Sequence, residues 1–256
     1  MFRKASTYAI WLALLWQALA AAHFHMLFPD PPSTVTDKPV TFTFQWGHPF
    51  EHELFDAVSP EKLVMVMPDG QQSVLTTSLA KTTIKGADQK DVTAFRFSFT
   101  PEKRGDYTCV ATAAPLWMEH ENHFLQDSVK VVLHVQTQKN WDAITGGFEL
   151  TPLTRPYGLQ PGMVFQAQVL DAGKPQAGAM AEVECYHAVA PKELPADEQM
   201  TRRVKADPNG VLTCTLTDPG WWCITAERAG GAREHDGKSY PVIQRTTLWV
   251  YVDPKP

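Results

Sequence analysis

Cysteine is scarce in this sequence, and glycine is less frequent than proline. Its 256 residues contain four cysteines, 15 glycines and 20 prolines. No segment from residue 38 onward shows a sustained helical period, which argues against a helical core. Frequent proline without helical periodicity indicates many short strands joined by turns.

Recognisable catalytic motifs are also absent. The sequence has no Gly-x-Ser-x-Gly elbow, no glycine-rich phosphate loop, no His-Glu-x-x-His helix and no Cys-x-x-Cys pair. Basic residues are outnumbered, with 23 Lys and Arg against 28 Asp and Glu. An acidic chain of this kind is a poor match for the phosphate backbone, so no nucleic-acid partner is expected.

A long hydrophobic run occurs only at the amino end. Arg3 and Lys4 precede an uncharged run from Tyr8 to Leu19, which three alanines follow. This pattern predicts a secretory signal peptide over residues 1–22, cleaved near Ala22. Because the run is shorter than the roughly 20 residues of a membrane-spanning helix, no retained anchor is expected. The protein is therefore predicted to be exported, and in a bacterium to be periplasmic.

The rest of the chain alternates apolar and polar residues in short segments, which is typical of strands. The expected strands are Val40–Trp46, Leu63–Met67, Ser73–Leu79, Thr93–Thr100, Asp106–Thr112, Asp127–Val135, Met163–Leu170, Ala181–Tyr186, Met200–Ala206, Gly210–Leu216, Trp222–Glu227 and Thr246–Val252. An all-β fold of two antiparallel β-sandwich domains follows.

The turns suggest how the two domains differ. Residues 23–137 are predicted to form an Ig-like sandwich, because Tyr107 lies two residues before Cys109 at the start of a late strand, as in a tyrosine corner. Residues 138–147 are weakly patterned and are predicted to be a linker. Residues 148–256 resemble the transthyretin-like and collagen-adhesin-like modules.

Two cysteines flank a turn in the second half. Thr217-Asp218-Pro219-Gly220 could close a hairpin in which Cys214 faces Cys223, near the separation that a disulfide needs. One residue of register slip would instead place the two on opposite faces, so the sequence leaves this bridge open.

Histidines gather at the predicted mature terminus. Cleavage after Ala22 would leave His23-Phe24-His25, whose amine, amides and third-position imidazole could bind Ni(II) or Cu(II) in a square plane. A different chelate would use the amine and the side chain of His23 together with another histidine. Surface histidines at a frayed end could also do nothing.

A second cluster follows the first long predicted strand. His48, Glu51 and His52 are spaced three and four apart, so a helical turn beginning at Pro49 would bring them to one side as ligands for a cation. A solvated polar turn is the alternative. A third cluster contains His120 and His123. We expect all three clusters at one end of the first sandwich.

Several motifs give the chain a family resemblance. It resembles the periplasmic components of cobalt and nickel uptake systems, a family built on a domain of otherwise unknown function. The matching segments are His23-Phe24-His25-Met26-Leu27-Phe28-Pro29, His48-Pro49-x-Glu51, Gly105-Asp106-Tyr107, Pro115-x-Trp117, Trp141-Asp142, Pro152-Leu153-Thr154-Arg155-Pro156-Tyr157-Gly158, Gly220-Trp221-Trp222 and His235-Asp236-Gly237-Lys238. The string ending in Arg155-Pro156-Tyr157-Gly158 is the most specific.

The resemblance implies a non-catalytic metal-binding protein that carries Ni(II) or Co(II) as cargo, with a membrane metal permease complex as the partner. It points to His23, His48 and Glu51 as ligands, while His25, His52, His120 and His123 are additions to the family pattern. Three alternatives remain: an exported copper carrier, a copper-dependent polysaccharide oxygenase with an amino-terminal histidine brace, and an adhesive or structural module.

Overall fold

A computed structural model describes residues 23–255, and the predicted signal peptide lies outside them. Strands make up 57% of the chain and helices 3%, which confirms the predicted all-β sandwich fold. The two helical segments are a 3₁₀ turn, Thr76–Ser78, and α1, Asp197–Met200. None of the helices in the described part is long and apolar enough to cross a membrane.

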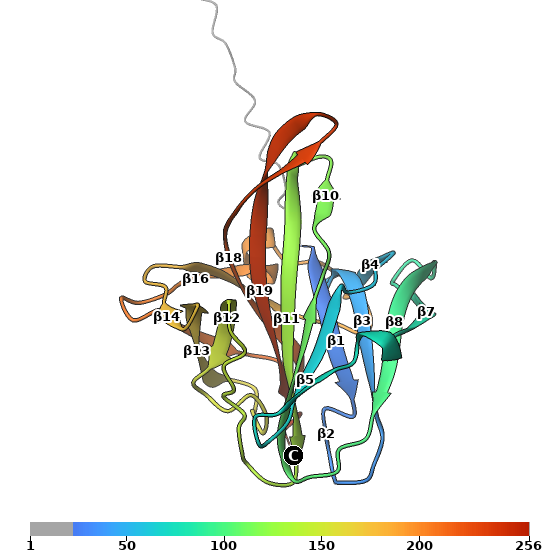
Figure 1. The fold of residues 1–256 in the computed structure, drawn as a ribbon, viewed down its shortest axis with the longest axis vertical. Coiled ribbons are helices and arrows are strands. Elements are labelled where there is room, and N and C mark those ends of the chain that lie inside the picture. The colour runs from blue at the N-terminus through green and yellow to red at the C-terminus, as the bar shows by residue number, and fades with distance from the viewer. Residues whose placement is uncertain (1–22, 256) are drawn as a thin grey trace, which may run out of the picture.

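Three sheets build the molecule (Figure 1). The five-stranded sheet runs β1 (Phe24–Asp30), β3 (Val40–His48), β8 (Asp91–Phe99) and β7 (Ala80–Lys85), with β4 (Glu53–Phe55) also paired to β3. The four-stranded sheet contains β12 (Phe148–Pro152), β13 (Met163–Asp171), β14 (Lys174–Pro175) and β17 (Val211–Leu216).

The third sheet has ten strands and belongs to both halves of the sequence. Its order is β16 (Arg202–Lys205), β15 (Met180–Cys185), β18 (Gly220–His235), β19 (Lys238–Val252), β11 (His123–Val135), β9 (Gly105–Thr112), β5 (Lys62–Val66) and β6 (Gln72–Val74). Two short strands, β10 (Leu116–Met118) and β2 (Ser33–Thr34), also pair with β11. The halves join where β11 and β19 pair in parallel, from Phe124 opposite Val242 to Val131 opposite Trp249.

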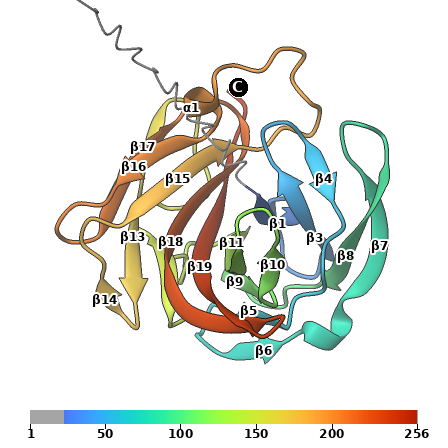
Figure 2. The same cartoon turned by 90° about the horizontal axis from the view of Figure 1, so that it is seen from above.

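Two large hydrophobic cores lie on either side of this shared sheet, whose strands β15, β18, β19 and β11 lie between β13 and β3 in Figure 2. The first core fills the space between the five-stranded sheet and β11, β9 and β5, and it also takes in Cys223 and Trp249 from the second half. The second core lies under β12, β13 and β17. Because β18 and β19 contribute side chains to both cores, the two halves pack as one body around the joint sheet.

Local sequence signals were informative in several places. The Tyr107 hydroxyl donates to the Lys103 carbonyl at 2.9 Å and accepts from the Lys103 N–H at 2.9 Å, which confirms the tyrosine corner. The expected strand Ser73–Leu79 is wrong in its second part, where Thr76–Ser78 forms a 3₁₀ turn.

The predicted hairpin between Cys214 and Cys223 is also wrong. Strand β17 pairs with β13, which places Cys214 opposite Phe165, whereas β18 pairs with β15 and β19, which places Cys223 opposite Glu184 and Trp249. The Asp218-Pro219 turn therefore carries the chain from one sheet to another. Cys214 packs on the second core and Cys223 in the first.

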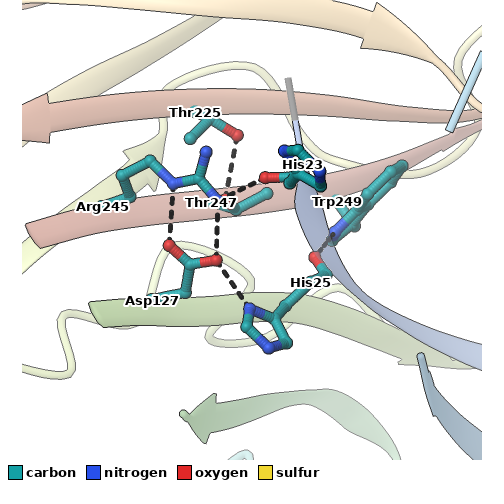
Figure 3. A network of polar contacts seen from close by, with 7 residues as sticks. All are labelled: His23, His25, Asp127, Thr225, Arg245, Thr247 and Trp249. Atoms are coloured by element: carbon teal, nitrogen blue, oxygen red, sulfur yellow. Dashed lines mark hydrogen bonds and ion pairs between the residues drawn. The ribbon is translucent and has the colours of Figure 1, made fainter. Parts of the chain in front are cut away.

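A buried ion pair connects the beginning and the end of the described chain (Figure 3). Arg245 on β19 donates to both carboxylate oxygens of Asp127 on β11, each at 2.8 Å, and also to the His23 carbonyl. Asp127 also lies 2.6 Å from Nδ1 of His25 on β1. Burial alone would raise the pKa of Asp127, but the charge and hydrogen bonds of Arg245, with those of His25, hold it well below its usual value.

We expect Arg245→Met to lower the free energy of unfolding by about 3 to 5 kcal/mol, because it leaves the Asp127 carboxylate buried without its main partner. Denaturant titration followed by tryptophan fluorescence would measure the loss. Arg203→Gln is a matched control, since Arg203 on β16 is largely exposed and pairs with Glu182 on β15. Equal losses in the two variants would contradict the central role of the buried pair.

All four cysteines are unpaired in the structure. The protein unfolded without reductant should therefore titrate as four free thiols. Two thiols together with a disulfide-linked peptide containing Cys214 and Cys223 would show that the bridge, which the sequence leaves open, does form.

Candidate functional site

His23 and His48 meet where β1 begins and β3 ends. In the antiparallel pairing of β1 with β3, Phe24 lies opposite Gly47. The next residue on each strand, His23 on one side and His48 on the other, therefore lies opposite its counterpart. The ring centroids of His23 and His48 are 4.4 Å apart. The sequence prediction that the first two histidine clusters converge is confirmed for these two residues.

Aromatic side chains surround the pair. The His23 ring stacks on Trp46 at 5.5 Å and lies 5.5 Å from Phe55, whose ring also meets His48 edge-on at 5.3 Å. These rings limit the rotamers of both imidazoles. A pair of imidazoles held in this way can offer nitrogen ligands with little loss of side-chain entropy on binding.

A carboxylate orients His48. His48 ends β3 and lies opposite Glu53, the first residue of β4, and its Nδ1 is 2.9 Å from the Glu53 carboxylate. The other ring nitrogen, Nε2, is buried and has no hydrogen-bond partner among the described residues. A carboxylate on Nδ1 selects the tautomer whose Nε2 lone pair is available to a ligand.

The segment between His48 and Glu53 is a four-residue hairpin turn, not the predicted helical turn. His52 closes this turn with φ of 54° and places its ring 5.6 Å from Tyr186. Burial lowers the pKa of His52, and its Nδ1 lacks a hydrogen-bond partner in the described chain. The carboxylate that contacts His48 is therefore that of Glu53 and not that of Glu51, which is half-buried near Glu184.

His25 has a structural environment. Its Nδ1 contacts Asp127, and its ring lies between Phe44 and Trp46, at 5.2 and 4.2 Å. The backbone carbonyl of His25 accepts a hydrogen bond from the Trp249 indole at 3.0 Å. His25 is 4% exposed, so its side chain is enclosed in the protein interior.

The third cluster lies at the turn between β10 and β11, which extends beside the β18–β19 hairpin and beyond the β3–β4 turn (Figure 1). His120 is exposed in that turn, and His123 begins β11 opposite Met118. In residues 23–255 no group of three or more His, Cys, Asp or Glu side chains is arranged to hold a metal ion. Among these residues the structure thus brings His23 and His48 together without a third side chain placed to complete a metal site.

Residues from the second half of the chain hold the turn between His48 and Glu53 in place. Glu184 on β15 accepts the Phe50 N–H at 3.1 Å and the Thr201 hydroxyl at 2.6 Å. The His187 N–H donates to the Pro49 carbonyl at 3.0 Å, and the His187 ring contacts the Phe50 carbonyl at 3.0 Å. None of these contacts could be read from the spacing of the histidines.

Comparisons with known proteins give a family and a distant set of folds. The family described as "Domain of unknown function (DUF4198)" matches residues 20–230. No curated protein matches the chain. Among solved structures, a DUF4785 family protein from Legionella pneumophila is 11% identical with a TM-score of 0.32, and the match covers 80% of this chain and 52% of that protein.

Two larger proteins are also similar over most of this chain. Salmonella alpha-2-macroglobulin is 16% identical with a TM-score of 0.26, over 90% of this chain and 15% of its own. Latent PorU from Porphyromonas gingivalis is 11% identical with a TM-score of 0.25, over 89% of this chain and 20% of its own. The chain therefore spans from about half to less than a fifth of these proteins, and none of these similarities carries a functional argument.

Glu184 should make the stability depend on pH. Burial raises its pKa to about 8, from 4.5 in the unfolded chain, with Glu51 and Glu182 adding to the increase. Between these values the folded protein holds a proton that the unfolded chain releases, so stability falls as pH rises. We expect wild type to lose about 2 to 4 kcal/mol from pH 5 to pH 8 through this group.

The substitution Glu184→Gln keeps a side chain that can still accept from Phe50 and Thr201 but does not titrate. Denaturant titrations of both proteins at pH 5 and pH 8 would isolate the contribution of Glu184. The variant should show a smaller decrease in unfolding free energy between the two pH values. An identical decrease in both proteins would mean that Glu184 is ionised in the folded state at pH 5.

Proposed function

We propose that this chain, which belongs to the DUF4198 family, binds a divalent transition-metal ion such as Ni(II) or Co(II) at His23 and His48. In this proposal the metal is cargo, and the protein serves metal uptake or delivery in the periplasm. A membrane metal permease complex is the proposed partner. The proposed role is non-catalytic, and the proposed ligands lie where β1 begins and β3 ends.

The observation that carries the proposal is the state of the His48 ring. Its Nδ1 is held by Glu53 at 2.9 Å, while its buried Nε2 has no hydrogen-bond partner in residues 23–255. A buried polar atom without a partner costs free energy, so such atoms are rare in folded proteins. A metal ion bound to Nε2 would satisfy it, and the Glu53 contact is the arrangement that commonly orients metal-binding histidines.

Two imidazoles alone are too few ligands for tight metal binding. Removal of the predicted signal peptide would supply a third nitrogen ligand. Cleavage before His23 would create an α-amino group on the residue whose ring already lies 4.4 Å from that of His48. The amine and side chain of His23 would then bind together with His48, giving three nitrogen ligands. This set suits Ni(II), Co(II) and Cu(II).

The alternative chelate, with His25 as the third residue, fits this structure less well. It would require the His25 ring to leave Asp127. It would also require deprotonated backbone amides at Phe24 and His25, in a strand that pairs with β3 along its whole length. The geometry therefore favours the chelate that begins at His23 and includes His48.

An exported copper carrier is the second candidate, because the amine and two imidazoles would also bind Cu(II). Copper binds most nitrogen sites more tightly than nickel does, so affinity alone does not identify the physiological metal. Metal analysis of protein exported from cells grown with limiting copper and ample nickel would distinguish the two. Copper as the main bound metal under those conditions would favour the copper carrier.

We expect His48→Ala to weaken Ni(II) and Cu(II) binding by roughly tenfold or more, since even outer partners of metal ligands contribute 10 to 100-fold. Calorimetric titration of exported protein, with its terminus verified by mass spectrometry, would measure this. His120→Ala is the matched control and should bind as wild type does. Unchanged affinity in His48→Ala would remove His48 from the site.

A protein that begins with Met before His23 tests the amine separately. It retains every histidine but moves the α-amino group away from His23, so its affinity should also fall by roughly tenfold. If the extended and processed proteins bind equally well, the α-amino group is not a ligand.

A further inference from the structure

A cavity of about 300 Å³ lies at the seam between the two halves, lined by residues that the proposed metal site does not use. Its lining comes from β2, β11, the loop 155–158 and the ends of β18 and β19. The loop contains Arg155-Pro156-Tyr157-Gly158, the end of the most specific string in the sequence. All four of these residues line the cavity.

One wall of the cavity is fixed by a buried carboxylate. Asp106 on β9 is fully buried, and its side chain lies 2.7 Å from Nδ1 of His134. It also accepts the Tyr157 hydroxyl at 3.0 Å and the Lys139 N–H at 2.7 Å. The Tyr157 and His134 rings stack with centroids 4.0 Å apart. His134 and Tyr157 therefore face the cavity in fixed orientations.

Opposite charges also line this cavity. The Arg155 Nε donates to the Tyr157 carbonyl at 3.2 Å, and its guanidinium lies 5.2 Å from the Tyr157 ring centroid. Asp253 is placed by its N–H, which donates to the Leu159 carbonyl at 2.8 Å. Within residues 23–255 no ion pair joins Arg155 to Asp253. The cavity thus presents one cation and one carboxylate that do not neutralise each other by contact.

Part of the remaining lining is aromatic. Trp221 and Tyr251 line the cavity and meet edge-on, with ring centroids 5.1 Å apart. The volume is at the lower end of the range for small-molecule sites, which are typically apolar with a few convergent polar groups. A small ligand with an apolar part and two opposite charges would match this lining.

We propose that the cavity binds a small zwitterion of the α-amino acid class, with its carboxylate on Arg155 and its ammonium group on Asp253. The apolar part of the ligand lies against Trp221 and Tyr251. The His134 ring, fixed through Nδ1 by Asp106, presents its other edge to the ligand. This proposal does not depend on the metal site, which lies at His23 and His48.

Equilibrium dialysis of the exported protein against a mixture of the protein amino acids, followed by mass spectrometry, is the first test. We expect selective retention of one or a few, with preference for apolar or aromatic side chains. Calorimetry would then compare the retained amino acid with its decarboxylated amine and its N-acetyl derivative. Each derivative lacks one charge and should bind about tenfold more weakly or worse.

Variants assign the two charges. Asp253→Asn should reduce the affinity for the retained amino acid by about tenfold or more and leave the affinity for its N-acetyl derivative unchanged. Arg155→Gln should reduce the affinity for the amino acid similarly. Asp236→Asn, in the exposed turn between β18 and β19, is the matched control and should bind as wild type does.

Two results would overturn the proposal. One is that dialysis at millimolar concentration retains no amino acid. The other is that Asp253→Asn, with a melting temperature equal to that of wild type, binds the retained amino acid as tightly as wild type does. Asp253 is exposed, and Asp253→Asn is a conservative substitution. The second result therefore does not depend on whether Arg155→Gln folds normally.

Discussion

The Asp127 carboxylate is the point at which the two ends of the described chain meet. It lies between Arg245, near the carboxyl end, and His25, near the amino end, and it is buried. An ionised group is stable in such a place only if its partners are well aligned, because desolvation costs several kcal/mol per ion. The alignment in turn requires β1, on one sheet, to keep its position relative to β11 and β19, on the other.

That arrangement of β1 against β11 and β19 also positions the candidate metal site. Arg245 donates to the His23 carbonyl, and the Trp249 indole donates to the His25 carbonyl, so β19 contacts the backbone of β1 at both histidines (Figure 3). Strand β1 pairs with β3, which ends at His48. The pairing of β1 with β3 thus brings His23 and His48 together, and contacts from β19, more than 200 positions away in the sequence, hold the backbone of β1 in place.

The sequence predicted local features well because their causes are local. The alternation of apolar residues located most of the strands, and Tyr107 before Cys109 predicted a corner that the hydrogen bonds to Lys103 confirm. The convergence of His23 and His48 could also be predicted, since both flank the ends of neighbouring strands. These inferences require only a period of two and a plausible sandwich topology.

The errors arose where long-range pairing decides. The hairpin prediction for Cys214 and Cys223 assumed that a tight turn returns the chain to the same sheet, whereas β17 and β18 belong to different sheets. The parallel pairing of β11 with β19 joins segments more than 100 residues apart, and no turn signal announces it. The helical turn expected after Pro49 failed because the pairing of His48 with Glu53 closes a hairpin there.

Three histidines have the same kind of hydrogen-bond partner but differ in what their rings can do. In each case a carboxylate contacts Nδ1: Asp127 for His25, Glu53 for His48 and Asp106 for His134. Only Asp127 also pairs with an arginine, and the His25 ring is packed between aromatic rings, so this unit stabilises the fold.

The other two histidines have different surroundings. His48 ends β3 and its Nε2 has no hydrogen-bond partner among the described residues, while His134 lines the cavity between the halves. The sequence alone could not separate these roles, because a histidine and its carboxylate may be 5 or 102 positions apart. What distinguishes a structural imidazole from a binding one here is the surroundings of its second edge, and those surroundings are set by how β11 and β19 bring the two halves together.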